Sequence, residues 1–143
     1  MRRSLPDGFE LDDNPGRVDV AEVHRFISEE SYWGKGRPLE LQRRFVQEAD
    51  RVVGVYHGNR QVGFARAVTD GHVVAYLADV YVLPEFRGHG LGVELVREMI
   101  DNGPYAEVSK WLLHTQDAQG LYQKFGFKAP EPRLMERVYP PRT

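Results

Sequence analysis

VYVLPEFRGHGLGVELVREMI, residues 80–100, joins an apolar strand, three alternate glycines and an amphipathic helix. Unpaired amide groups and the helix dipole make a helix N-terminus attractive to anions. The missing side chains of Gly88, Gly90 and Gly92 would let phosphate oxygens approach those amides. The stretch therefore predicts a phosphate-binding loop between a strand and a helix.

Two common phosphate-binding motifs do not match this loop. A nucleoside-triphosphate P-loop ends in Gly-Lys-Ser/Thr, which is absent here. A dinucleotide-binding turn reads Gly-x-Gly-x-x-Gly in a parallel unit, whereas these glycines alternate after predicted hairpins. Two alternatives stay open from the residues alone: a glycine turn that only packs the helix on the strand, and a loop that binds a different nucleotide.

Outward from the loop, the sequence predicts one α+β domain over residues 1–143 with a mostly antiparallel, mixed central sheet flanked by about four helices. The nearly unbroken apolar stretch 72–82 is expected inside the sheet, covered on both faces. Asp117 is expected to cap a short helix. The predicted strands are 8–11, 51–57, 61–68, 72–82, 110–115 and 133–139, and the predicted helices are 19–30, one from Pro38, 91–100 and one from Asp117.

Composition limits the class of protein. The net charge of −2 provides no broad basic surface, so neither nucleic acid nor membrane is expected as a partner. With no cysteine, the chain has no thiol nucleophile, disulfide or thiolate metal site. No apolar run approaches the roughly 20 residues that span a bilayer, and we expect a cytoplasmic protein.

Two motifs resemble a known family. Residues 87–92, RGHGLG, resemble the Arg/Gln-x-x-Gly-x-Gly/Ala signature of the GNAT acyl-CoA N-acetyltransferases, and they follow DVYVLPEF, which is similar to the strand end before that signature. LYQKFGF, residues 121–127, is similar to the family's second landmark. The order of predicted elements also fits from about residue 8 to residue 138. The resemblance implies a GNAT fold and acetyl-CoA as co-substrate, with no metal.

The resemblance also implies which residues bind acetyl-CoA. The pyrophosphate would lie on the amides of residues 88–93, and the pantetheine arm would run beside the strand at residues 80–82. Thr115 stands where many relatives carry an asparagine that contacts the cofactor, so its role departs from the family pattern. The implied cofactor-binding residues are Val80, Tyr81, Val82, Arg87, Gly88, His89, Gly90, Leu91, Gly92, Val93 and Thr115.

Tyr122 holds the position of the family's usual general acid. A tyrosine, with a pKa of about 10, is well matched to protonate a departing thiolate. Its apolar neighbours leave a core role open. The base that deprotonates the amine is not determined: Asp79 is the first candidate and His114 the second, and either residue could instead be structural.

The acceptor amine is expected to meet the loop SYWGKGR, residues 31–37, where GNAT proteins shape the acceptor pocket. Tyr32, Trp33 and Arg37 could hold an aromatic or carboxylate-bearing amine, or could pack the loop on the sheet. Arg66 and Asp70 could reach the same pocket or lie in solvent. A small-molecule acceptor is expected over a protein, and a homodimer is left open. The alternative function is a non-catalytic acyl-CoA-binding or sensing module.

Overall fold

A six-stranded sheet forms the centre of the computed structural model, which describes residues 1–139. The strands lie in sequence order, and all neighbours are antiparallel except the last pair, which is parallel. This arrangement confirms the predicted mixed, mostly antiparallel sheet. The strands are β1 (Arg2–Ser4), β2 (Phe9–Asp12), β3 (Arg51–His57), β4 (Arg60–Thr69), β5 (Val74–Val82) and β6 (Lys110–Leu112).

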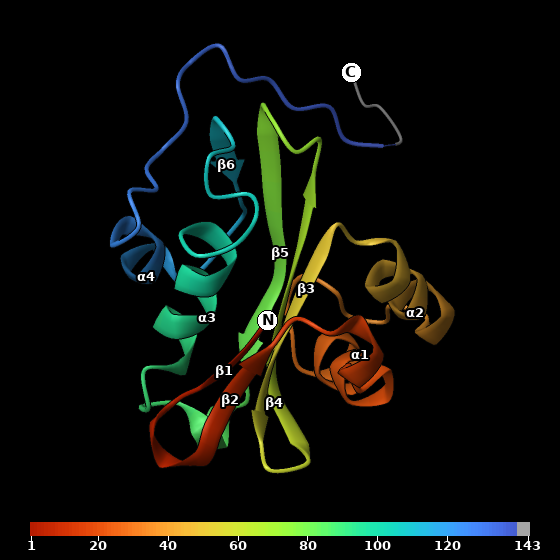
Figure 1. Cartoon of the computed structure of the whole chain (residues 1–143). Coiled ribbons are helices and arrows are strands. Elements are labelled where there is room, and N and C mark those ends of the chain that lie inside the picture. The colour runs from red at the N-terminus through yellow and green to blue at the C-terminus, as the bar shows by residue number, and fades with distance from the viewer. Residues whose placement is uncertain (140–143) are drawn as a thin grey trace.

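Helices cover both faces of the sheet (Figure 1). On one side lie α1 (Val20–Glu29) and α2 (Leu39–Glu48), and on the other lie α3 (Leu91–Ile100) and α4 (Gln119–Gln123). Within residues 1–139, no helix is long and apolar enough to cross a membrane.

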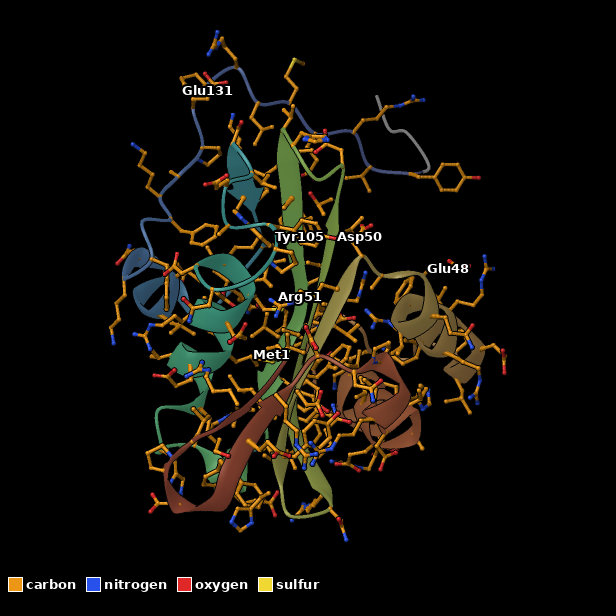
Figure 2. All side chains as sticks on the ribbon, in the orientation of Figure 1. Met1, Glu48, Asp50, Arg51, Tyr105 and Glu131 are labelled. Carbon is orange, nitrogen blue, oxygen red and sulfur yellow. The ribbon has the colours of Figure 1, made fainter. Side chains whose placement is uncertain are left out.

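Each long helix buries one apolar stripe against the sheet. The carboxylate of Asp19 caps α1 by accepting from the Glu22 amide at 3.1 Å. From α1, Phe26 stacks on the ring of Tyr81 in β5 at 4.1 Å between centroids. On the opposite face, α3 buries Leu95, Val96 and Met99. Side chains from both layers fill the space between helices and sheet (Figure 2).

A buried ion pair ties α3 to the sheet. Arg51, at the start of β3, donates to the Glu98 carboxylate at 3.0 Å and to the Glu98 carbonyl at 2.8 Å. Arg51 is labelled near the centre of Figure 2, between β3 and α3. This pair holds the C-terminal end of α3 in place.

A bulge in β5 prepares the region that the sequence singled out. The register with β4 shifts between Phe64 and Arg66, so that Asp79 and Val80 lie opposite one residue of β4. Asp79 has a φ of 56°, in the left-handed region that aspartate tolerates better than most residues. Because β6 pairs with β5 only over 74–76, residues 77–82 have no strand partner on that side.

Three sequence predictions about elements were wrong. Residues 133–139 form no strand: they follow two prolines, and Met135 and Tyr139 are about nine-tenths exposed, so the segment buries little apolar surface. Asp117 does not cap α4, which begins without a side-chain cap from its N-cap residue, Ala118. The strand predicted over 72–82 is inside the sheet but alternates between buried and partly exposed residues, so it is not covered equally on both faces.

Candidate functional site

The glycine loop follows β5 through a 3-10 turn at Pro84–Phe86 and leads into α3. Gly88 and Gly90 have φ values of 91° and 73°, a backbone conformation that other residues adopt at a cost. A Cβ atom added at either glycine would meet no atom within 4 Å. These two glycines are therefore needed for the path of the backbone and not to admit a neighbouring side chain, which weakens the packing-only alternative.

The loop presents a row of backbone donors. Within the described residues, the amides of 88–93 donate no hydrogen bond to another backbone group, and no side chain of the N-cap residue satisfies them. Such amides at the start of a ten-residue helix point toward the same region and favour a negative charge there. The donor set suits the phosphate oxygens of an elongated anionic ligand.

Two polar side chains of the loop, Arg87 and His89, have contacts within the protein. Arg87 turns back and donates from Nε to the Val82 carbonyl at 3.2 Å. The His89 ring packs on Phe9 at 5.1 Å between centroids. Both side chains stay near the amide row, at the end of β5 and beside β2.

Helix α4 lies against this loop. A Cβ atom on Gly92 would lie 3.9 Å from Leu121 Cδ2, so the residue before Tyr122 touches the start of α3. Tyr122 is 8% exposed, and its ring packs edge-on to Phe127 at 5.8 Å. Burial, with smaller contributions from Tyr32 and Asp117, raises the pKa of Tyr122 to about 12.

The Tyr122 hydroxyl has no hydrogen-bond partner among the residues that the structure describes. The hydroxyls of Tyr56 and Tyr81, two core residues, are also unpaired and are buried, so a missing partner does not by itself distinguish Tyr122 from a core tyrosine. The geometry thus leaves a protonated, unengaged donor beside the glycine loop.

The loop between α1 and α2 has a fixed conformation. Ser31 Oγ donates to the Ile27 carbonyl at 2.6 Å and accepts from the Gly34 amide at 3.0 Å. His24 Nε2 lies 2.8 Å from the Arg37 carbonyl. A side chain at Gly34 would overlap Ile27, so this glycine allows close packing. Residues 31–37 therefore hold their side chains in defined positions before any ligand arrives.

Two aromatic side chains of this loop remain accessible. Tyr32 and Trp33 are 46% and 41% exposed, and their rings meet edge-on at 5.1 Å. The Tyr32 hydroxyl accepts from the Gln116 amide at 2.7 Å, which joins the loop to the segment that precedes α4. The predicted acceptor loop and the Tyr122 region are consequently neighbours, although they are far apart in sequence.

Asp79 is the centre of a charged cluster at the β5 bulge. Its carboxylate accepts from the Trp33 indole at 2.9 Å, and its side chain is only 2% exposed. Arg37 donates twice, at 2.8 and 3.1 Å, and Arg66 Nε donates at 2.7 Å. Burial opposes ionisation, but the hydrogen bonds and charges of the two guanidinium groups outweigh it, so the pKa of Asp79 is lowered.

This arrangement bears on Asp79 as the predicted base. A carboxylate with a lowered pKa and four occupied acceptor positions is a weak proton acceptor. The contacts favour a positioning role, in which Asp79 holds Trp33 and Arg37 in place. The second candidate, His114, contacts the Tyr76 hydroxyl through Nδ1, lies 3.5 Å from Glu136 through Nε2, and is exposed.

Two further candidates have local structural contacts. Thr115 Oγ1 accepts from the Ala118 amide at 3.0 Å, which fixes the turn that leads into α4. Asp70 Oδ1 accepts from the amides of residues 72–74, which fixes the turn before β5. Hydrogen bonds from these amides lower the pKa of Asp70. Of the pair Arg66 and Asp70, only Arg66 joins the charged cluster.

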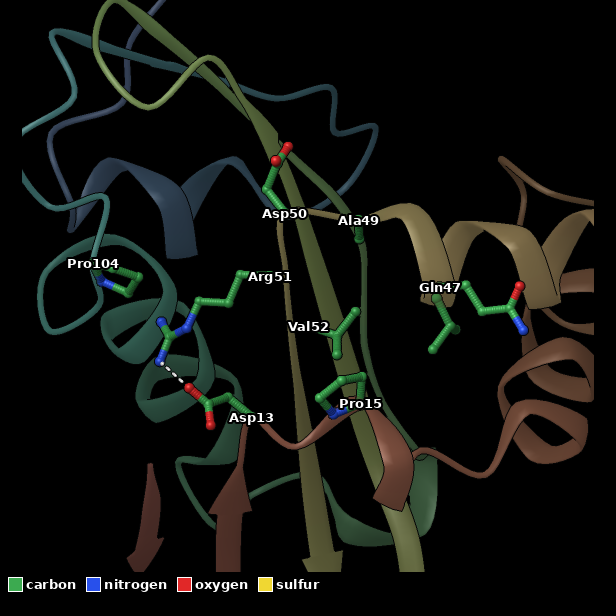
Figure 3. Close-up of a pocket in the computed structure, with 9 residues that line it drawn as sticks. Asp13, Pro15, Gln47, Ala49, Asp50, Arg51, Val52 and Pro104 are labelled. Carbon is green, nitrogen blue, oxygen red and sulfur yellow. Dashed lines mark hydrogen bonds and ion pairs between the residues drawn. The ribbon is translucent and has the colours of Figure 1, made fainter.

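A shallow cavity of about 260 Å³ lies elsewhere, at the start of β3 (Figure 3). Arg51 and Asp13 line it and pair with each other at 3.3 Å, as the dashed line in Figure 3 marks. None of the predicted site residues lines this cavity. It is therefore separate from the glycine loop and the charged cluster.

Comparison with known proteins identifies the family. Residues 48–129, more than half of the chain, match the family described as "Acetyltransferase (GNAT) domain". The chain belongs to the GNAT acetyltransferase family. It is an acetyltransferase, with the GNAT fold that the two motifs predicted.

Individual relatives agree with this assignment. A solved structure from Xanthomonas campestris pv. campestris, assigned to the GNAT family, is 34% identical, covers 96% of each chain and has a TM-score of 0.87. The "uncharacterized N-acetyltransferase ycf52" of Porphyra purpurea is 30% identical over 85% of this chain and 74% of its own length. Glucosamine-6-phosphate N-acetyltransferase from Arabidopsis thaliana, 14% identical with a TM-score of 0.64 over 92% of this chain and 98% of its own, shares the fold.

Sequence reasoning missed the connections within the site. Arg37 and Arg66 carry the charge opposite to that of Asp79, and the three residues come from a loop, β4 and β5. Asp79 lies at the β5 bulge, and its carboxylate contacts both arginines. The hydrogen bond from Gln116 involves a backbone amide and has no sequence signature. The available signal was the presence of an aspartate inside an otherwise apolar strand, where an unpaired charge would be costly.

Proposed function

We propose that this chain transfers the acetyl group of acetyl-CoA directly to a primary amine of a small molecule. The observation that supports the proposal is that Tyr122 follows Leu121, whose side chain approaches Gly92 at the start of α3, while Tyr32 of the aromatic loop bonds to the Gln116 amide just before α4 and affects the pKa of Tyr122. A phosphate-bearing ligand and an amine could therefore approach the same hydroxyl from two sides.

The residues present fit acetyl-CoA. The amides of 88–93 would hold its pyrophosphate, and the open side of β5 at residues 80–82 would pair with the amide groups of the pantetheine arm. When bound, acetyl-CoA supplies an activated acetyl thioester.

Tyr122 is the proposed proton donor to the sulfur of the departing thiolate. Because burial raises its pKa to about 12, the hydroxyl keeps its proton through the neutral range. An ordinary alkylamine has a pKa of about 10.4 and must lose a proton before it can attack. Tyr32 and Trp33 would favour the neutral amine by partly removing it from water, while Asp79 holds their loop.

Direct transfer in a ternary complex follows from the nucleophiles available. The sequence has no cysteine to carry an acyl group, and no serine with a recognisable base and orienting acid. Attack of the bound amine on the thioester carbonyl requires only that both ligands are held side by side.

The experiment is a thiol-release assay with acetyl-CoA and a panel of amines, with the acetylated product identified by mass spectrometry. We expect thiol release that depends on the amine and equals product formed. Acetyl-CoA binding without turnover on any amine would instead indicate the binding or sensing module. Tight binding of other nucleotides, with no binding of acetyl-CoA, would contradict the assigned ligand.

A further inference from the structure

Arg66 has hydrogen-bonding capacity that the fold does not use. It extends from β4, and its side chain is 14% exposed. Its Nε donates to Asp79 at 2.7 Å, while its two terminal nitrogens donate to no residue in the described part of the chain. The guanidinium lies over the ring of Phe45 at 4.2 Å, so its plane is held in one orientation.

Arg37 differs from Arg66 in this respect. One terminal nitrogen of Arg37 donates to both Asp79 and Gln42, each at 2.8 Å, and the other donates to Asp79. Arg37 is therefore engaged within the protein, and Arg66 is the arginine of the cluster with donors to offer.

The cluster also carries an excess of positive charge. Two guanidinium groups, those of Arg37 and Arg66, face the single Asp79 carboxylate. On the neighbouring side, His114 lies 3.5 Å from Glu136, an exposed pair. Because the cluster is partly buried, its excess positive charge attracts an anion more strongly than the same charge would in open solvent.

We propose that the acceptor is an amine that also carries an anionic oxygen group, a carboxylate or a phosphate, and that Arg66 binds this group. The inference rests on the proposed function and names the substrate class for it. Paired N–H donors of a guanidinium match the two oxygens of a carboxylate or phosphate. Trp33 bonds to the same Asp79 carboxylate as Arg66, so the anion would be bound beside the aromatic loop.

The test compares amines in matched pairs: β-alanine with β-alaninamide, and phosphoethanolamine with ethanolamine. A charged hydrogen-bonded contact is worth roughly 1.5–3 kcal/mol, so we expect kcat/KM for the anionic member to be about 10- to 100-fold higher. The amine pair with the larger ratio of kcat/KM, anionic member to neutral member, shows whether carboxylate or phosphate is the preferred group. Equal values within both pairs, or higher values for the neutral members, would overturn the inference.

Two variants assign the effect to Arg66. Arg66→Gln should lower kcat/KM for the anionic member of each pair far more than for the neutral member, so that the ratio between the two members falls toward one. Arg66→Lys keeps the positive charge and should keep part of the preference for anionic amines. It also provides a test if the glutamine variant does not fold. Arg44→Gln, which removes an exposed arginine of α2, is the control and should leave the preference unchanged.

Calorimetric affinity for coenzyme A should be the same in all these proteins. If kcat/KM falls equally for the anionic and the neutral member of each pair in both Arg66 variants, Arg66 has a structural role and the inference is overturned. Turnover of neutral amines alone would contradict only the anionic acceptor. No turnover with any amine would contradict the proposed function, and this inference with it.

Discussion

The indole nitrogen of Trp33 donates to the Asp79 carboxylate at 2.9 Å and so joins the loop after α1 to the bulge in β5. The two residues are 46 positions apart. Arg37 strengthens the same connection through its two bonds to Asp79. The shape of the proposed acceptor pocket therefore depends on one strained residue of the central sheet.

Replacing Asp79 by asparagine tests this dependence. Asparagine has the same shape and also tolerates a positive φ, so the variant chiefly removes the charge that pairs with Arg37 and Arg66. Breaking a buried ion pair in this way typically costs about 3–5 kcal/mol of unfolding free energy. Urea denaturation at pH 7 measures the loss. A difference below about 1 kcal/mol would show that the cluster contributes little to stability.

The difference in unfolding free energy between wild type and Asp79→Asn should also depend on pH. Because the folded-state pKa of Asp79 is lowered, its contribution is fully present above its unfolded pKa of about 3.9 and is lost as the pH falls through the folded value. The stability difference between wild type and Asp79→Asn should be constant from about pH 5 to 7 and shrink below about pH 4. A difference that stays constant at acidic pH would contradict the lowered pKa.

Gly90→Ala tests the glycine loop, with Gly58→Ala as a matched control. Both glycines have positive φ, 73° and 61°, and an added Cβ atom meets nothing at either position. Each variant should lose about 1–2 kcal/mol of stability from backbone strain alone. Only Gly90→Ala should weaken coenzyme A binding in calorimetry, by about tenfold or more, since it alters the amide row. Equal affinity in the two variants would remove this loop from the binding site.

Trp33→Phe keeps an aromatic ring but removes the N–H donor to Asp79. We expect KM for the amine to rise by several-fold up to about tenfold, with KM for acetyl-CoA little changed, because the loop is proposed to contact the acceptor and not acetyl-CoA. Steady-state kinetics with each substrate varied in turn separates the two constants. A parallel rise in both would indicate that the loop supports the whole fold.

Tyr122→Phe removes one hydroxyl that has no partner in the described structure, so stability should change little. Turnover should fall by about 10²–10⁴, as for loss of a general acid. With a pKa of about 12, Tyr122 remains protonated from pH 6 to 10, so the loss should be uniform over that range. Turnover close to wild type would leave Tyr122 as a core residue.

The sequence predicts some parts of the chain better than others. RGHGLG and LYQKFGF carry strong local signals, because few residues other than glycine adopt the positive φ values found in these segments. These two motifs led to the correct family. The segment 133–139 contains four residues that are common in strands or cores, but it has no strand partner, and pairing depends on the rest of the sheet. The cluster around Asp79 depends on a bulge, and no local residue pattern specifies that two distant arginines meet there.

The most direct test of the account is the initial-rate pattern with acetyl-CoA and an accepted amine varied together. Direct transfer requires both ligands on the protein at once, so double-reciprocal plots should give intersecting lines, with one thiol released per amine acetylated. Parallel lines would indicate an acyl-enzyme intermediate and contradict direct transfer. Thiol release that does not depend on any amine would contradict the proposed acetyltransfer itself.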